Sequence, residues 1–508
     1  MKVILISTDK KIYDSNSAVS KRMAEYGSLF ERLDVIIFSK KSSQQLVVST
    51  KLSENVFVYP TNSRNKLSYI FDAFRIFRKL TTDYKLLTTD LVISTQDPFE
   101  TGIIGLILKL FYKLPLQVQV HTDFANKHFI THSLLNFIRF PLGLLVLSFA
   151  DSVRCVSERI AKSIQSLSHN ILVLPIQIER WKDGKMERLE NKDKKEINFL
   201  TVARLEKEKD LETAIRAFKR AIDSGVKATF TIVGDGSQRK NLESLSKNYN
   251  LQSKIYFVGW QNNLEDYYEN ADVYISTSLF EGYGMSVVEA ARFGVPLILS
   301  DAGIAHDFFK NNEGAFVCKP KDINSFAEAM IKLVSDQTLR EKMGQMAKTA
   351  VDERWVEKNQ YLEKYKNSIE KAKEFYSSDL GIFKKNILLR YLVAGFTGAG
   401  TNIGLLYILT DIVGIWYLYS SALSFAAAVV VSFVLQKFWT FNDKEVAKVH
   451  HQFFRFLGVA LFGIIINTAC MFLLVDVFSL WYILAQIITG ALIAIINFLM
   501  YKFFIFNK

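Results

Sequence analysis

The residues best suited to chemistry lie in the run from Phe280 to Met285, which reads FEGYGM. Gly282 and Gly284 allow the main chain to come close to a ligand, and the helix expected after them would present free N–H groups to a phosphate. Glu289, eight residues after Glu281, falls in that helix, where its carboxylate can accept two hydrogen bonds from a ribose diol. The run therefore indicates a site for a nucleotide diphosphate, and an ordinary glycine-containing turn is the alternative.

A second group of candidate residues follows the apolar run INFLTV and reads ARLEKEKD, from Ala203 to Asp210. Arg204 can hold a diphosphate through two N–H groups and Lys209 can act as a point charge, so together they would stabilise negative charge on a leaving group. Runs of lysine and glutamate usually form a solvated face, and this interpretation is kept for Lys207. The position after a strand favours ligand binding by the other two cations.

Further candidates follow other predicted strands. Gly234 and Gly236 form a GDG turn after ATFTIV, and Gly259 ends KIYFVG; a tight turn is the alternative for both. His121 ends the predicted strand LQVQVH. Its side chain would face the cleft between the domains, and a merely structural role is the alternative. Because no D-x-D pattern occurs before the apolar C-terminal region, no metal is expected to bridge the diphosphate, and Arg204 with Lys209 would take that role.

Short β-rich runs alternate with longer helical patterns through most of the chain, which is the βαβ rhythm of a parallel, doubly wound sheet. The rhythm stops in a charged stretch near 180–196 and then restarts. We therefore predict two Rossmann-like domains in tandem, at 1–178 and 190–376, the second including a closing helix. Ligands of such sheets bind at the C-terminal ends of the strands, where the candidate residues lie.

The composition changes near residue 385, where charged residues become rare and four apolar stretches appear, near 389–410, 418–436, 455–475 and 483–501. Each is long enough to cross a bilayer as a helix, so an all-α transmembrane domain of four helices is predicted at 385–508. A repeat of 65 residues pairs Arg390 with Arg455 and Asn402 with Asn467. Because each unit holds two helices, the repeats share one orientation.

The distribution of charge sets the topology. Lys and Arg cluster at the helix ends that also carry the termini, so the positive-inside rule places both termini and the α/β domains in the cytoplasm at the cell membrane. The whole chain has 63 Lys and Arg against 51 Asp and Glu, a net charge of +12. No nucleic-acid-binding signature accompanies this charge, so we expect a membrane surface or a phosphorylated substrate as the partner.

These motifs, in this order and spacing, resemble the family 4 retaining glycosyltransferases of GT-B fold, most specifically over about 197–300. The resemblance implies that Arg204 and Lys209 bind the donor diphosphate, and that Glu281 and His121 contact the transferred sugar. It also implies anomeric retention, no essential metal or other cofactor, and closure of the domains over a UDP- or GDP-type donor. The full set of implied donor-binding residues is Arg204, Lys209, Gly234, Gly236, Gly259, Gly282, Tyr283, Gly284, Met285 and Glu289. The glycine-rich loop of this family is replaced here by Ser7 to Asn16, which contains no glycine.

Residues from about 386 to the end resemble the GtrA-like membrane family, which is associated with polyprenyl-phosphate-linked sugars. The expected activity is therefore hexosyl transfer to a lipid-linked or polyprenyl-phosphate acceptor in cell-surface polysaccharide or glycolipid synthesis. The alternative is a transporter of a lipid-linked sugar, with the α/β domains supplying or recognising the sugar. The membrane domain could also join copies of the chain into a homo-oligomer. Asn402 and Asn467 would line a site or serve as interhelical contacts.

Overall fold

The structure is a computed structural model, and it describes residues 1–41, 49–65, 68–83, 90–165, 167–168, 170–177, 196–311, 313–376, 387–441, 443, 449–477, 489, 493–494, 496–497, 500–501 and 505–506. The chain divides into two compact units, Met1–Ser378 and Asp379–Lys508. The first unit contains both α/β domains.

The first domain is built on an eight-stranded sheet with the order β3-β4-β2-β1-β5-β6-β7-β8. Neighbouring strands are parallel except for β3 and β4, which are antiparallel. The central strands are buried on both faces and therefore read as continuous apolar runs such as Val3–Ile6. The strands are β1 (Lys2–Ser7), β2 (Arg32–Ile37), β3 (Thr50–Ser53), β4 (Val56–Pro60), β5 (Leu91–Thr95), β6 (Leu116–Val120), β7 (Ser152–Cys155) and β8 (Ile171–Val173).

The second domain has a seven-stranded parallel sheet with the order β11-β10-β9-β12-β13-β15-β14. The order reverses at β9, where β10 lies on one side and β12 on the other, which is the switch point at which such sheets bind ligands. The strands are β9 (Ile197–Val202), β10 (Ala228–Val233), β11 (Ile255–Gly259), β12 (Val273–Ser276), β13 (Leu297–Ser300), β14 (Lys310–Asn311) and β15 (Gly314–Cys318).

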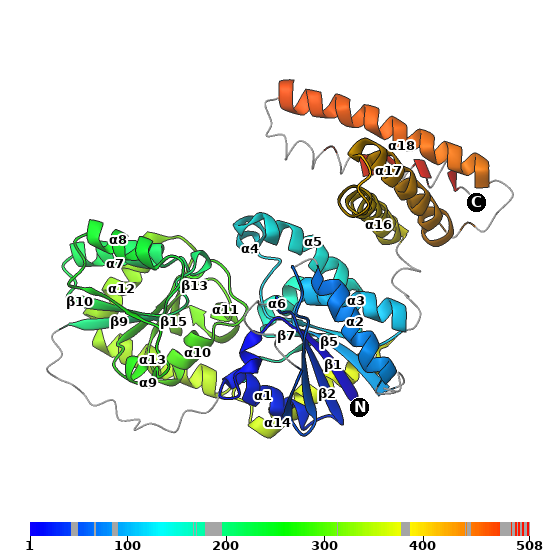
Figure 1. Ribbon diagram of the computed structural model, residues 1–508. Helices are drawn as coiled ribbons and strands as arrows, with labels where there is room; N and C mark the ends of the chain where they lie inside the picture. The colour runs from blue at the N-terminus through cyan, green and yellow to red at the C-terminus, as the bar shows by residue number, and fades with distance from the viewer. Residues whose placement is uncertain are drawn as a thin grey trace. The chain divides into compact units, whose positions relative to one another are not determined.

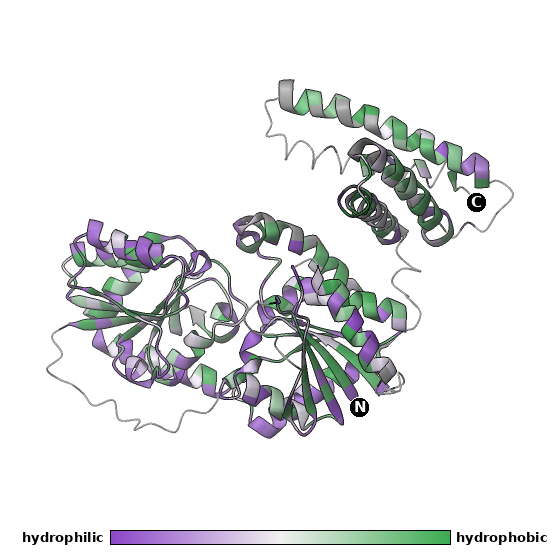
Figure 2. Cartoon of the chain, viewed as in Figure 1, coloured by the Kyte–Doolittle hydropathy of each residue, from purple (hydrophilic) through white to green (hydrophobic). Residues whose placement is uncertain are grey.

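Helices cover both faces of each sheet, so both domains are three-layered (Figure 1). Figure 2 shows hydrophobic residues along the strands and hydrophilic residues on α7 and α8. The helices of the first domain are η1 (Lys10–Tyr13), α1 (Ala18–Gly27), α2 (Ser68–Asp83), α3 (Glu100–Tyr112), α4 (Lys127–His132), α5 (Leu134–Phe149) and α6 (Glu158–Ile164). Those that follow are η3 (Lys207–Lys209), α7 (Leu211–Asp223), α8 (Arg239–Asn248), α9 (Glu265–Glu269), α10 (Met285–Arg292), α11 (Ala305–Phe308), α12 (Ile323–Ser335), α13 (Gln337–Asp352) and α14 (Lys358–Glu374).

The last of these helices, α14, follows the second domain in sequence but packs on the first sheet. Its buried residues Tyr361, Tyr365 and Ile369 belong to the same apolar core as Val3 and Leu33. Tyr365 also stacks on Tyr26 of α1, with ring centroids 3.9 Å apart. The chain therefore returns to the first domain before it enters the membrane region.

The second unit consists of long apolar helices: α16 (Ile387–Tyr407), α17 (Tyr417–Val434) and α18 (Val449–Met471). Each continues into a wide turn of π-helix, η4 (Ile408–Ile412), η5 (Leu435–Thr440) and η6 (Phe472–Val477). Because 408 + 65 = 473 falls within η6, the turn after α16 recurs after α18 at the predicted repeat distance.

Two segments of the described residues meet the length and hydropathy of a membrane span, Val393–Ile412 and Ala422–Thr440. Figure 2 shows the hydrophobic residues along these helices. The hydroxyl of Ser424 donates a 2.8 Å hydrogen bond to Asn402 Oδ1, so this predicted mid-helix amide has a partner on the neighbouring helix. Most of the fourth apolar stretch, 483–501, and the side chain of Asn467 lie outside the described residues.

Candidate active site

Three loops meet at the C-terminal edge of the second sheet, and glycine allows them to touch. Gly234 has a φ of +133°, and a Cβ there would lie 1.9 Å from the carbonyl oxygen of Ala203. A Cβ on Gly236 would lie 2.5 Å from the carbonyl oxygen of Leu205. The N–H of Gly234 donates to the carbonyl of Gly259 over 2.8 Å. These three predicted glycines therefore hold the loops after β9, β10 and β11 together around Arg204.

The predicted cations of the loop after β9 lie in different environments. Lys209 forms an ion pair with Glu281, and both side chains are largely buried, with 17% and 21% exposed. Glu281 also accepts a 2.9 Å hydrogen bond from the hydroxyl of Ser278. Arg204 is 65% exposed and pairs with Glu208 over 3.0 Å, one turn further along the chain. The structure thus brings Lys209 and Glu281 together and leaves Arg204 open to a ligand.

The main chain of these loops is also joined. The N–H of Leu279 donates to the carbonyl of Glu208 over 2.8 Å, and the hydroxyl of Thr277 donates to the carbonyl of Lys209 over 3.0 Å. The loop after β9 is therefore fixed against the loop after β12, which holds the ion pair in place.

Helix α10 begins at the second glycine of the FEGYGM run. Gly284 is its N-cap residue, with a φ of +97°, and Met285 is its first residue. Glu289 lies one turn later and accepts a 2.6 Å hydrogen bond from the hydroxyl of Tyr268. Burial raises the pKa of the Glu289 carboxyl, and the hydrogen bond from Tyr268 opposes this shift. Tyr268 was not predicted as a site residue, because nothing in its local pattern indicates a partner for a carboxylate distant in sequence.

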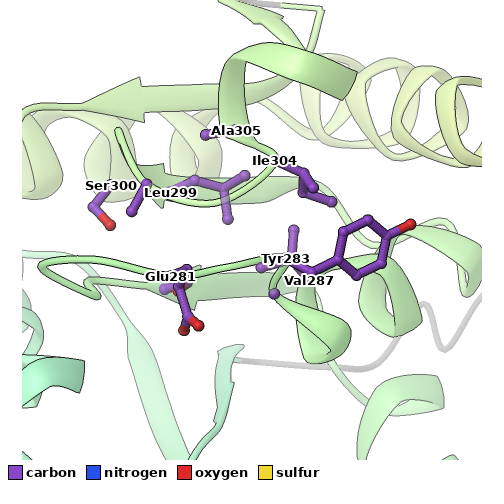
Figure 3. A pocket seen from close by; sticks show the side chains of 10 residues that line it. Glu281, Tyr283, Val287, Leu299, Ser300, Ile304 and Ala305 are labelled. Atoms are coloured by element: carbon purple, nitrogen blue, oxygen red, sulfur yellow. The ribbon is translucent and has the colours of Figure 1, made fainter. Parts of the chain in front are cut away.

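A small pocket lies beside the start of α10. Its volume is about 10 Å³, room for little more than one water molecule. In Figure 3, Leu299, Ile304 and Ala305 face Tyr283 and Val287 across the pocket. Tyr283 is 7% exposed, and burial raises the pKa of its phenol well above the ordinary value. The predicted Tyr283 therefore contributes an apolar wall rather than a titrating group.

The two α/β domains touch directly at Gly282. A Cβ on this residue would lie 1.8 Å from the carbonyl oxygen of His121 and 2.6 Å from its carbonyl carbon. The neighbouring residue Phe280 packs against Phe129 and His132 of α4, with ring centroids 5.4 and 5.5 Å apart. The structure therefore places the predicted His121 beside the FEGYGM run, although 160 residues separate them in sequence (281 − 121).

The imidazole of His121 is neutral over the whole physiological range. Burial, together with the positive charges of Arg154 and Arg22, lowers its pKa to about 3. Its Nε2 lies 3.2 Å from Oε1 of Gln119, two residues earlier on β6. A neutral imidazole can contact a sugar through hydrogen bonds but cannot supply positive charge.

An arginine that no sequence motif predicts also joins the two α/β domains. Arg159 of α6 donates its main-chain N–H to Asp307 over 2.9 Å and its Nε to the carbonyl of Gly303 over 3.1 Å, and it pairs with Asp301. A lone arginine at the start of a helix carries no motif, so only the tertiary structure reveals this contact. The loop after β1, in place of a glycine-rich loop, forms η1, in which Asp9 accepts from the N–H of Lys11 over 3.0 Å.

Two family models match the chain. Residues 183–350 match "Glycosyl transferases group 1", and residues 390–506 match "GtrA/DPMS, transmembrane domain". The chain therefore carries a group 1 glycosyltransferase domain followed by a GtrA/DPMS transmembrane domain, as the sequence motifs predict.

Among curated proteins, the chain is similar to the UDP-Gal:alpha-D-GlcNAc-diphosphoundecaprenol alpha-1,3-galactosyltransferase of Escherichia coli, with 25% identity over 61% of this chain and 82% of that protein. It is also similar to the alpha-monoglucosyldiacylglycerol synthase of Streptococcus pneumoniae, with 26% identity over 53% of this chain and 66% of that protein. Both names describe sugar transfer, so the relatives favour a transferase over a transporter.

Solved structures confirm the fold. Sucrose-phosphate synthase of Thermosynechococcus elongatus aligns over 70% of this chain and 94% of its own, with a TM-score of 0.57 and 19% identity. The lipopolysaccharide outer core galactosyltransferase WaaB aligns over 73% of this chain and 99% of its own, with a TM-score of 0.56 and 17% identity. The α/β unit therefore has the GT-B fold, and the comparisons together support a membrane-associated glycosyltransferase.

Proposed function

We propose that this chain, with its group 1 glycosyltransferase domain and GtrA/DPMS transmembrane domain, transfers a hexose from a nucleotide diphosphate sugar to a lipid-linked or polyprenyl-phosphate acceptor. The product would enter a cell-surface polysaccharide or glycolipid. The single observation that carries the donor half is the largely buried ion pair of Lys209 with Glu281, which joins the loop of Arg204 to the loop that leads into α10, the helix of Glu289.

The donor would bind across the loops of the second domain. Arg204 and Lys209 would hold the diphosphate, and the free N–H groups at the start of α10 would add hydrogen bonds to it. The partly buried carboxylate of Glu289 would accept hydrogen bonds from the ribose diol. Since Lys209 already pairs with Glu281, the diphosphate would share the lysine with the carboxylate, which keeps both side chains in one geometry.

The reaction would retain the anomeric configuration. The bond between the anomeric carbon and the diphosphate oxygen would break, and the acceptor oxygen would bond to the same face of that carbon. The acceptor proton would pass to an oxygen of the leaving diphosphate. Arg204 and Lys209 would stabilise the charge on this leaving group without a metal ion, and Glu281 would lie next to the sugar.

The membrane domain would keep the enzyme with its acceptor. We propose four spanning helices with both termini and the α/β domains on the cytoplasmic side, where the basic residues of the helix ends lie. A lipid-linked acceptor then diffuses in the same bilayer as the enzyme, while the water-soluble donor arrives from the cytoplasm.

The test uses the full chain in lipid nanodiscs. A thermal-shift screen against UDP, GDP and their sugars should identify the donor, because a bound ligand raises the melting temperature by mass action. Transfer from that donor to lipid extract should then fall at least ~10²-fold in Glu281→Gln and Arg204→Ala.

Arg216→Ala serves as the matched control, because Arg216 is a partly exposed arginine of α7 that pairs with Glu212 in the preceding turn of its own helix and donates to the hydroxyl of Tyr249. Its transfer rate should equal that of the unmodified protein. Full transfer by both site variants would refute the assignment of the site.

A further inference from the structure

We infer that Gln119 and Arg154 are positioning residues that fix the hydrogen-bonding state of His121, so that its imidazole offers the donor sugar a hydrogen-bond acceptor and no donor. This inference rests on the proposed function, because it needs a sugar bound beside His121. It adds two residues of the first domain to the determinants of sugar specificity.

The orientation of the Gln119 side chain follows from Arg154. This arginine is 3% exposed, and its guanidinium donates to Gln119 Oε1 over 3.0 Å and to the hydroxyl of Tyr361 over 2.9 Å. Its guanidinium carbon also lies 5.2 Å from the ring centre of Tyr365. A guanidinium can only donate hydrogen bonds, so the Gln119 atom facing it is the carbonyl oxygen. The amide nitrogen on the other side donates to Ser94 Oγ over 3.1 Å, which agrees with this orientation.

The same oxygen decides where His121 carries its proton. Nε2 of His121 lies 3.2 Å from Gln119 Oε1, and a carbonyl oxygen can only accept, so Nε2 carries the hydrogen. The pKa of about 3 excludes a second proton near neutral pH. Nδ1 is then left with a lone pair and can only accept a hydrogen bond.

The charged groups around His121 maintain this state. The nearest charges are cationic, and the phenols that surround Arg154 are buried; the carboxylate of the facing loop, Glu281, is already paired with Lys209. The groups concerned are Arg22 of α1, Arg154 of β7, Tyr26 of α1, and Tyr361 and Tyr365 of α14. No carboxylate contacts the imidazole within the described residues, so no ion pair favours its protonated form.

The first experiment changes the neutral acceptor to an anionic one. In Gln119→Glu, the carboxylate next to Nε2 should raise the pKa of His121 towards the neutral range, since an opposite charge favours the protonated form. Below that pKa both ring nitrogens donate and the acceptor at Nδ1 is lost. In nanodiscs, kcat/KM for the nucleotide sugar should therefore fall ~10-fold or more between pH 8 and pH 5.5, relative to the unmodified protein. Affinity for the free nucleotide diphosphate should keep its ordinary pH dependence.

Gln117→Glu is the matched control. Gln117 lies two residues earlier on the same face of β6, is fully buried, and hydrogen-bonds Ser94 and Ser368 instead of the histidine. Gln117→Glu should lose as much thermal stability as Gln119→Glu, but it should not show the additional fall in kcat/KM between pH 8 and pH 5.5. The inference is overturned if Gln119→Glu binds donor with an unchanged pH profile, or if Gln117→Glu shows the same profile.

A second experiment leaves the hydrogen bonds of β6 unchanged and alters the donor instead. The sugar hydroxyl that contacts His121 is identified with a series of deoxy sugars. Its removal lowers transfer by the unmodified protein but not transfer by His121→Ala. At that position a deoxyfluoro sugar should be as poor a donor as the deoxy sugar, because fluorine can accept a hydrogen bond but cannot donate one. Full activity with the fluoro sugar would show that His121 donates and would overturn the inference. If no nucleotide sugar binds the unmodified protein, the proposed function fails instead.

Discussion

Replacement of Gly282 by alanine tests whether the contact between the two α/β domains is needed for catalysis. The added Cβ would lie 1.8 Å from the carbonyl oxygen of His121, whereas Cβ contacts shorter than 3.0 Å essentially never occur. The main chain of one domain must therefore move by at least 3.0 − 1.8 = 1.2 Å. Because main chain faces the new methyl group, no side-chain rotation can relieve the clash. Gly282 is not among the glycines with positive φ, so alanine causes no left-handed strain.

The expected effect falls on catalysis and spares stability. A displacement of about 1 Å between the sugar and the groups that hold it costs ~10²-fold in rate, which corresponds to about 2.7 kcal/mol in the barrier. Steady-state kinetics in nanodiscs should therefore show kcat/KM reduced ~10²-fold with a melting temperature close to that of the unmodified protein. The substitution leaves the apolar cores of both α/β domains unchanged, so the fold should be retained.

Gly284→Ala is the control for backbone strain, since Gly284 has a φ of +97° but its nearest atom to a new Cβ, Val287 Cγ2, is 3.5 Å away. It should lose about 1–2 kcal/mol of stability through its left-handed conformation. Gly225→Ala, with a φ of +89° and nothing within 4 Å, gives the same strain on the far side of the domain. A folded Gly282→Ala variant with unchanged kcat/KM would refute the reasoning.

Three further substitutions test individual contacts. Lys209→Gln removes one partner of a largely buried ion pair and leaves Glu281 unpaired, so it should lower the melting temperature and reduce transfer by ~10²-fold or more; transfer within twofold of normal would contradict the role of the lysine. Glu289→Gln keeps the shape but offers one acceptor oxygen, so affinity for the donor, measured by calorimetry, should fall by about 1–3 kcal/mol. A donor with 2′- or 3′-deoxyribose should lose the same binding free energy with the unmodified protein. With Glu289→Gln, the deoxyribose donor should bind no more weakly than the normal donor. Asn402→Leu removes the acceptor of a 2.8 Å hydrogen bond between α16 and α17 and should cost about 0.6–1.7 kcal/mol, measured as a small fall in the thermal midpoint of the membrane unit. An unchanged thermal midpoint in Asn402→Leu would show that the amide has a role other than helix packing.

The strands that precede the candidate residues could be predicted because all of their residues are buried or partly buried. Runs such as INFLTV, ATFTIV and LQVQVH contain enough apolar or β-branched residues to identify a parallel strand, and a parallel strand identifies its C-terminal end as the place for ligands. Arg204, Lys209 and His121 are predicted as site residues by this reasoning.

The partners of those residues could not be predicted in the same way. Tyr268 reaches Glu289 from 21 residues away, and Arg154 reaches Gln119 from 35 residues away, so no local spacing announces either contact. The structural reason for these glycines also differs from the tight turn or close approach to a ligand that the sequence suggests. Gly234 is a glycine because the carbonyl of Ala203 leaves no space for a Cβ, a constraint that only the packed loops reveal.

The position of α14 determines which of the two α/β domains is connected to the membrane unit. Its residues Tyr361, Tyr365 and Ile369 belong to the core of the first domain, and the chain continues from this helix towards the membrane unit. In sequence, the membrane unit therefore follows a helix of the domain that holds His121, while the second α/β domain is an insertion in the sequence of the first. Under the proposed function, a movement of this insertion on donor binding would leave the connection between the first domain and the membrane unit unchanged.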